Sequence, residues 1–315
     1  MNNDHFVART YLKHWADPGP MRAYRKSDLK SFPCWPADVC AEMGGDLNPE
    51  YLKNPALLGQ FRSIFEPHWN EAVEAVRERH MTSEHKYIIA GYWANLVSAT
   101  PTLRNIGVNL FEKEIQSVLP MFIKDHPPPE SLKNAKLTVE VDPNYIKAVA
   151  TTQLLAGTWQ LYNQPWTILV NGTEDEFITS DNPSALYPPP AIGAGPTVRI
   201  LPISPRLCIS TVMDQTKAPT RELTREDLTS RPQGPITYHD IVPDGVTLAN
   251  RLIAANADNL VFSRTENPKV AALVEEFRDH GVQLHHSVKE TPANGGHITQ
   301  SAIFVGKKPK SSSAA

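Results

Sequence analysis

The sequence lacks any apolar run long enough to cross a bilayer, which requires about 20 residues. Its most membrane-like stretch, YIIAGYWANLVSAT, is interrupted by Gly91, Asn95 and Ser98 and predicts a buried helix instead. The amino terminus is polar and acidic, without the basic segment and apolar run of a secretory signal. We therefore expect a cytoplasmic protein that makes no contact with a membrane.

Cysteine is scarce and the net charge is small. Cys34, Cys40 and Cys208 are an odd number, at spacings that match no common zinc motif, so we expect reduced, buried thiols. The 31 basic and 34 acidic residues leave a net charge of −3, which offers no general attraction to nucleic acid. Recognition of a phosphate must then come from a local cluster of basic residues.

Several catalytic signatures are also missing. The chain contains no Gly-x-x-x-x-Gly-Lys-Ser/Thr phosphate loop, no Gly-x-Gly-x-x-Gly, no His-Glu-x-x-His, no Gly-x-Ser-x-Gly and no Cys-x-x-Cys. A restriction-type nuclease is disfavoured because TEDEFIT lacks the Asp/Glu-x-Lys pattern and DQTK has one residue too many between its acid and its lysine. These absences narrow the classes of enzyme that the chain can represent.

What the sequence does contain is a core-forming composition and helical periodicity in its first half. Hydrophobic residues make up 41% and charged residues 21%, as in folded proteins, and 28 prolines predict many fixed turns. Apolar residues at spacings of three and four predict helices over 58–76, with an interruption at Pro67, and over 85–99, 102–123 and 144–162. The proline-rich segment KDHPPPESL is predicted to be a loop.

Beyond residue 163 the pattern changes to strands. WTILV and EFITS flank an Asn171-Gly172 turn and predict a β-hairpin, and TVRILPI, LCISTVM and NLVFS predict further strands. Helical spacing returns in VTLANRLIAANAD and PKVAALVEEFRDHG. We predict an α+β fold: a mainly helical half at 1–163 packs on a mixed, largely antiparallel sheet in 164–288, late helices cover one face, and 289–315 form a mostly flexible tail.

A row of basic residues runs through HFVARTYLKHW. If this segment is a helix, the spacing of four places His5, Arg9 and Lys13 on one face, beside an apolar stripe. Such a row needs carboxylates, water or a bound anion to offset its repulsion. Two interpretations stay open, namely pairing with acidic residues elsewhere in the fold and binding of an anionic substrate.

Polar residues also gather where the strand in FITSDNP ends. Asp181 at this corner is a candidate catalytic and metal-binding carboxylate, with Ser180 and Asn182 as candidate substrate-binding neighbours. The same residue types before a proline also form turns by hydrogen bonding to their own backbone, without any ligand. The site and the purely structural interpretation both remain open.

Two residues of the helical half are candidate partners for this corner. Glu66 lies among large apolar residues in SIFEPHW, where a carboxylate must be paired, protonated or metal-bound, so it is a candidate base or metal ligand. Arg104 lies near a predicted helix start, which is unfavourable for a cation, and is therefore a candidate for binding an anion. A buried ion pair is the alternative for each.

Three segments give the chain a family resemblance. The pattern His-x-Val-x-x-x-Tyr-Leu-x-x-Trp between His5 and Trp15, then FITSDNP and PISP, resemble the bacterial, archaeal and fungal proteins grouped as domain of unknown function 4238 (DUF4238). Ala8 stands where that family usually has proline, and Ser184 stands where an aliphatic residue usually follows. The resemblance covers most of the chain and implies a similar helix-then-strand layout, but no established activity.

These residues support two hypotheses about function. In the first, the protein is a hydrolase of a phosphate-bearing or other anionic substrate or nucleotide: Asp181 and Glu66 act as bases or bind a divalent metal ion, His5 moves a proton, and Arg9, Lys13 and Arg104 hold the anion. In the second, the same residues form a structural polar network in a non-catalytic protein that binds a ligand or partner, such as a component of a bacterial defence or stress system. A second copy of the chain is a further candidate partner, through apolar helix faces.

Overall fold

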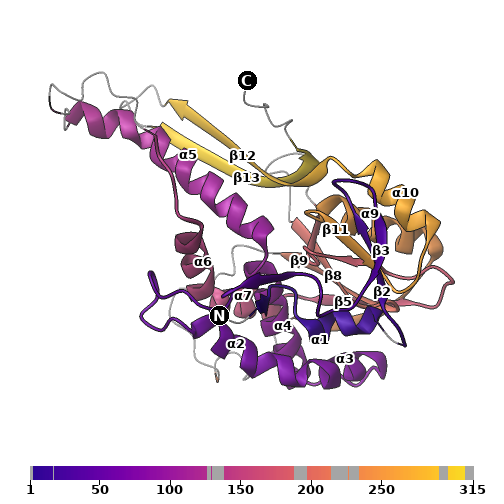
Figure 1. Ribbon diagram of the computed structural model, residues 1–315. Coiled ribbons are helices and arrows are strands. Elements are labelled where there is room, and N and C mark those ends of the chain that lie inside the picture. Colours follow the sequence, from indigo (N-terminus) through magenta and orange to yellow (C-terminus); the bar gives the residue numbers. More distant parts are fainter. Residues whose placement is uncertain are drawn as a thin grey trace.

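The computed structural model of the protein describes residues 3–16, 18–125, 129, 138–187, 197–213, 226, 234–290 and 297–308. Helices from the first half of the chain form one layer, and two β-sheets with the late helices form the other (Figure 1). The architecture is therefore α+β, as the sequence predicts.

The helical layer is organised around α4 (Ser83–Ser98), most of whose residues are buried. Against it lie α2 (Leu57–Phe65), the 3-10 turn η2 (Glu66–His68) and α3 (Trp69–Arg77), which together form the interrupted helix that Pro67 predicts. Gly91 lets α2 approach closely, because a Cβ atom there would lie 2.2 Å from the ring of Phe65. α6 (Pro143–Thr152) and α7 (Leu154–Asn163) complete the layer, and α7 packs on α4.

The larger sheet has five strands in the order β10-β5-β9-β8-β7. They are β10 (Ile236–Ile241), β5 (Trp166–Asn171), β9 (Leu207–Met213), β8 (Thr197–Ser204) and β7 (Ala185–Tyr187). Only the β10–β5 pair is parallel among these strands. Successive residues point to opposite faces, so Ile209 packs in the core under the helical layer and Cys208 packs with α9 (Pro243–Asn256).

The smaller sheet draws strands from both ends of the chain. Its order is β3 (Ser31–Cys34), β2 (Met21–Arg25), β11 (Leu260–Ser263) and β6 (Thr179–Ser180), and α10 (Pro268–Glu276) packs on β2. The hairpin expected between WTILV and EFITS is therefore wrong, because β5 and β6 belong to different sheets. After Asn171 the chain leaves the large sheet: the Phe177 N–H donates to the Pro205 carbonyl, and Thr179 pairs with Phe262.

The long helix α5 (Pro101–Asp125) and the hairpin of β12 (His280–Glu290) and β13 (His297–Lys307) project together from the body of the molecule (Figure 1). The expectation of a flexible tail from residue 289 is wrong for β13, because a continuous antiparallel ladder with β12 satisfies its backbone. Residues 309–315 and most of the loop expected at KDHPPPESL lie outside the described residues. No helix in the described part combines the length and the apolar content that a bilayer span requires.

The amino-terminal segment is not the single helix that would align three basic residues. Residues Asn3–His5 form β1, which pairs with β4 (Ala41–Met43), and the helical part is limited to α1 (Arg9–Leu12) and the 3-10 turn η1 (Lys13–Trp15). Ala8 has an extended backbone (φ −63°, ψ 146°), so the helix begins only at Arg9. His5 is paired in a β-ladder and does not share a helix face with Arg9 and Lys13.

Candidate functional site

The short helix α1 is fixed to the sheets by two buried side chains. The Tyr11 hydroxyl donates to the Pro202 carbonyl oxygen at 2.6 Å and lies 2.8 Å from the Thr179 hydroxyl. The Trp15 indole N–H donates to the Phe177 carbonyl oxygen at 2.9 Å. The first motif of the family resemblance is thus hydrogen-bonded to both of the others, FITSDNP and PISP. This junction sets the direction in which the remaining side chains of α1 point.

Those remaining side chains line a solvent-open recess with a volume of about 860 Å³. Its walls come from α1 and η1, the segment after β3, the η2 and α3 region, and the β8–β9 turn. The basic residues of the lining are Arg9, Lys13, Arg77, Arg206 and Arg264, and its carboxylates are Glu66 and Glu176. The lining therefore carries a net charge of +3, whereas the whole chain carries −3.

The two carboxylates of the lining form ion pairs with only some of these cations. Glu176 forms ion pairs with Arg264 and, at 3.5 Å, with Arg206. The side chains of Arg9 and Lys13, in contrast, are exposed and make no hydrogen bond or ion pair with any residue in the described part of the chain. Their positive charge is available to a bound anion, and two neighbouring cations, one on α1 and one at the start of η1, favour such a ligand over an empty recess.

Glu66 is oriented by the same helix. The Thr10 hydroxyl donates to Glu66 Oε1 at 2.9 Å, and the Tyr92 hydroxyl lies 3.0 Å from the Thr10 oxygen. Burial raises the pKa of Tyr92, so this phenol stays protonated and acts as a hydrogen-bond donor. Glu66 Oε2 receives no hydrogen bond from the described residues. One oxygen of this carboxylate is therefore fixed in place while the other is available within the recess.

His14 contributes a neutral imidazole to the wall. Burial and the nearby Arg77 lower the pKa of His14 to about 4, so the ring is uncharged at neutral pH. Its edge meets the Trp69 ring at a centroid distance of 6.4 Å. Its Nε2 atom is buried and has no hydrogen-bond partner among the described residues.

His5 lies beside this recess and does not line it. Its Nε2 atom is 3.2 Å from the carbonyl oxygen of Ala37, which belongs to the lining. The loop that carries Trp35 and Pro36 is thereby connected to β1. Of the residues that the sequence singles out, Arg9, Lys13 and Glu66 all line the recess. His5 does not line it, but it contacts the lining residue Ala37.

Asp181 lies elsewhere, in a buried turn. Its two carboxylate oxygens accept hydrogen bonds from the backbone N–H groups of Asp258, Asn259 and Leu260 at 2.8–2.9 Å. Burial, with Asp258 nearby, raises its pKa to about 6 despite these three donors. Asp181 does not line the recess, and its contacts hold the corner after β6 against the turn between α9 and β11.

The neighbours of Asp181 serve the same corner. The Ser180 hydroxyl accepts the N–H of Asn182 at 3.2 Å, and the Asn182 side chain donates to the Asn256 carbonyl at 3.0 Å. The side chains of Ser180, Asp181 and Asn182 are all buried. These are contacts of the purely structural interpretation, and none of the three residues lines the recess.

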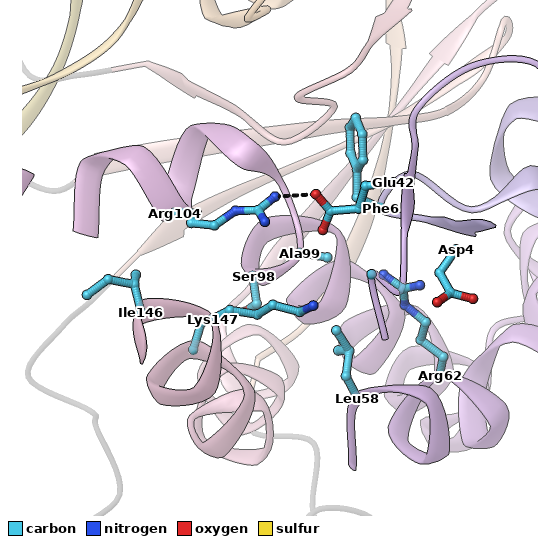
Figure 2. Close-up of a pocket in the computed structure, with 12 residues that line it drawn as sticks. Asp4, Phe6, Glu42, Leu58, Arg62, Ser98, Ala99, Arg104, Ile146 and Lys147 are labelled. Atoms are coloured by element: carbon cyan, nitrogen blue, oxygen red, sulfur yellow. Dashed lines mark hydrogen bonds and ion pairs between the residues drawn. The ribbon is translucent and has the colours of Figure 1, made fainter. Parts of the chain in front are cut away.

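Arg104 belongs to a second, much smaller cavity, shown in Figure 2. Its guanidinium donates to Glu42 Oε2 at 2.8 Å, and Arg62 in the same cavity pairs with Asp46. The cavity has a volume of about 10 Å³, enough for roughly one water molecule. The charges here are largely paired with one another, which leaves the recess at Arg9 as the better candidate for a ligand.

Other lining residues carried no signal in the sequence that marked them as part of a site. Arg77, Arg206, Arg264 and Glu176 lie on separate elements, and each looks like an ordinary surface charge in its local context. Among the residues that the structure describes, no three His, Cys, Asp or Glu side chains gather as metal ligands would.

Fold and site together define an α+β protein with a basic recess at the junction of its helical layer and its sheets. The chain belongs to the family described as "Protein of unknown function (DUF4238)", whose model matches residues 3–267. The resemblance seen in the sequence is thereby confirmed. No curated protein and no solved structure matches the chain.

Proposed function

We propose that the protein binds a small phosphate-bearing or otherwise anionic molecule in the recess beside α1. The observation that supports this most is the pair Arg9 and Lys13, two exposed cations without a partner in the described chain, in a lining of net charge +3. The volume of about 860 Å³ lies within the range of small-molecule sites, roughly 300–1,000 Å³. A guanidinium beside an ammonium offers both bidentate and point-charge contacts to phosphate oxygens.

The test is calorimetric titration of the protein with pyrophosphate at low salt. Loss of a charged hydrogen bond weakens binding by roughly 1.5–3 kcal/mol, so Arg9→Ala/Lys13→Ala should raise the Kd at least about tenfold. The control Lys30→Ala/Lys53→Ala removes the same charge from exposed positions outside the lining and should leave the Kd within about twofold. Equal affinities of the two double variants would refute the proposal.

Hydrolysis of the bound anion is the second candidate function, and Glu66 is the residue that favours it. Its free Oε2 would take a proton from a water molecule as the water oxygen attacks the phosphorus, and the leaving oxygen would depart with a proton from solvent. A divalent cation, if the reaction uses one, would meet Glu66 in the recess, because Asp181 lies outside it. Turnover of phosphoesters with and without Mg²⁺ tests this step. Glu66→Gln should abolish turnover while pyrophosphate still binds.

We also propose that this function is carried out in the cytoplasm. The support is the state of the cysteines: Cys34, Cys40 and Cys208 are all buried and free. Unpaired buried thiols are typical of proteins in a reducing compartment. Localisation of a tagged full-length chain tests this assignment.

A further inference from the structure

One large aromatic side chain in the lining of the recess has no stacking partner among the residues that the structure describes. Trp35 is 52% exposed, whereas Trp15, Trp69, Trp93 and Trp166 are fully buried. Trp35 lines the recess, and no described ring or cation stacks on its indole. An exposed tryptophan in a recess leaves a large apolar face in water, and contact with a flat apolar ring would remove that face from water.

Hydrogen bonds of the backbone order the turn that carries this indole. Trp35 follows β3 directly, and its N–H donates to the Asp38 carboxylate at 3.1 Å while the Asp38 N–H donates to the Trp35 carbonyl at 2.9 Å. Two residues further along this turn, the Ala37 carbonyl is 3.2 Å from His5 Nε2. The turn is thus closed on itself and tied to β1, so the ring is presented by an ordered segment.

We infer that the anion bound in the recess also carries a planar ring, and that the ligand class is a nucleotide with its base on Trp35 and its phosphates on Arg9 and Lys13. This inference rests on the proposed function. Stacking on an aromatic side chain accepts any base, because every base has a π-face. Phosphate binding at this site does not need a phosphate loop, because the cations that would contact the phosphates are side chains of α1, η1 and the surrounding elements.

The charge of the site favours a mononucleotide over a nucleic-acid strand. A net lining charge of +3 matches the charge of a nucleoside di- or triphosphate, whereas a strand needs a basic track along the surface. The chain as a whole is acidic, with a net charge of −3, which would repel a long polyanion. The basic charge is concentrated in one recess of limited volume.

The test compares ATP with inorganic tripolyphosphate, which has the phosphates but no base. Wild-type protein should bind ATP at least about fivefold more tightly than tripolyphosphate. Trp35→Leu should weaken ATP binding roughly tenfold and leave tripolyphosphate within about twofold, and Trp35→Phe should restore part of the loss. Tyr187→Leu is the matched control, because Tyr187 is 50% exposed and lies outside the recess.

The outcomes separate this inference from the proposed function. If ATP and tripolyphosphate bind equally and Trp35→Leu changes neither, the nucleotide assignment is overturned while anion binding stands. If neither compound binds the wild-type protein, anion binding itself fails. A single-stranded oligothymidylate that binds more tightly than ATP would overturn the mononucleotide assignment in favour of a strand. Because Trp35 is half exposed, Trp35→Leu is expected to fold, and its circular dichroism and melting temperature verify this.

Discussion

The Tyr11 hydroxyl donates a hydrogen bond of 2.6 Å to the Pro202 carbonyl oxygen, between residues 191 positions apart in the chain. Both groups are buried, so this bond and that of Trp15 to Phe177 hold a helix of only four residues on the sheets. Arg9 lies on the same helix and is exposed to the recess. The residues of the first motif thereby divide into those that fix the helix and those that are free to meet a ligand.

Replacing Tyr11 with phenylalanine should destabilise the protein without changing its fold. The variant leaves the Pro202 carbonyl without its donor in a buried site, and an unsatisfied buried group costs roughly 1–3 kcal/mol. We expect the free energy of unfolding in urea to fall by about that amount. Tyr51→Phe removes a hydroxyl that bonds to Asp142 at an exposed position and should change the stability by less than about 0.5 kcal/mol. Equal losses in the two variants would contradict the role of the Tyr11 hydroxyl.

Two helical glycines should respond in opposite ways to alanine. At Gly91 a Cβ atom would lie 2.2 Å from the buried Phe65 ring, so Gly91→Ala should cost about 1–3 kcal/mol through forced repacking of α2 on α4. At Gly157 in α7 a Cβ atom would meet only the Ala94 Cβ, at 3.5 Å. Gly157→Ala should therefore raise the stability by up to about 1 kcal/mol through helix propensity. Thermal melts of both variants would show this, and a stabilised Gly91→Ala would contradict the close packing of α2 and α4.

Much of the fold follows from local patterns in the sequence, and the errors arise where pairing is long-range. The apolar stripe through Phe61, Phe65 and Trp69 predicts α2 and α3, including the interruption at Pro67, because a helix satisfies its backbone within itself. Several strands after residue 163 also follow from the sequence, but β7 and β10 do not, and the one pairing predicted, between WTILV and EFITS, is wrong. Thr179 pairs with Phe262, and no local pattern specifies a partner so far away along the chain.

The residues of the candidate site are likewise only partly predictable from the sequence. The row of Arg9 and Lys13 and the carboxylate of Glu66 are visible in the sequence as unusual positions, and the structure places all three in one recess. Arg206 and Arg264 could not be assigned to it, because a charged residue on a loop or strand end is ordinary wherever it occurs. The FITSDNP corner stood out for its polar residues, and its hydrogen bonds show how a buried turn uses such residues to satisfy backbone groups.

The imidazole of His14 should make the stability depend on pH. Its pKa is lowered to about 4, whereas an unfolded histidine has a pKa of about 6.5. Between these values the unfolded chain takes up a proton that the native protein does not. The contribution of His14 to the free energy of unfolding is therefore fully present above about pH 6.5 and is lost as the pH falls towards 4.

The size of this effect is measured against a variant that cannot titrate. From about pH 7 to about pH 4.5, the wild-type protein should lose roughly 2–3 kcal/mol more of its unfolding free energy than His14→Gln. Urea denaturation at both pH values provides the comparison. A constant difference between the two proteins would mean that the native imidazole takes up a proton as easily as the unfolded one.

Asp181 distinguishes the corner from the recess, because its removal should affect stability and leave ligand binding intact. In Asp181→Asn an amide group replaces one of the oxygens that accept the N–H groups of residues 258–260, so two donors face each other in a buried turn. We expect the free energy of unfolding at about pH 7 to fall by roughly 2–4 kcal/mol. Asp142→Asn is the control, since Asp142 accepts the Asn144 N–H at an exposed position and should lose much less.

The decisive comparison is the affinity of folded Asp181→Asn for pyrophosphate, measured at low temperature. Since Asp181 does not line the recess, the Kd should stay within about twofold of the wild-type value. Arg9→Ala, at an exposed position, should show the reverse pattern, with weaker binding and a nearly unchanged stability. If folded Asp181→Asn fails to bind, the carboxylate acts on the ligand, and the site must include the corner after β6.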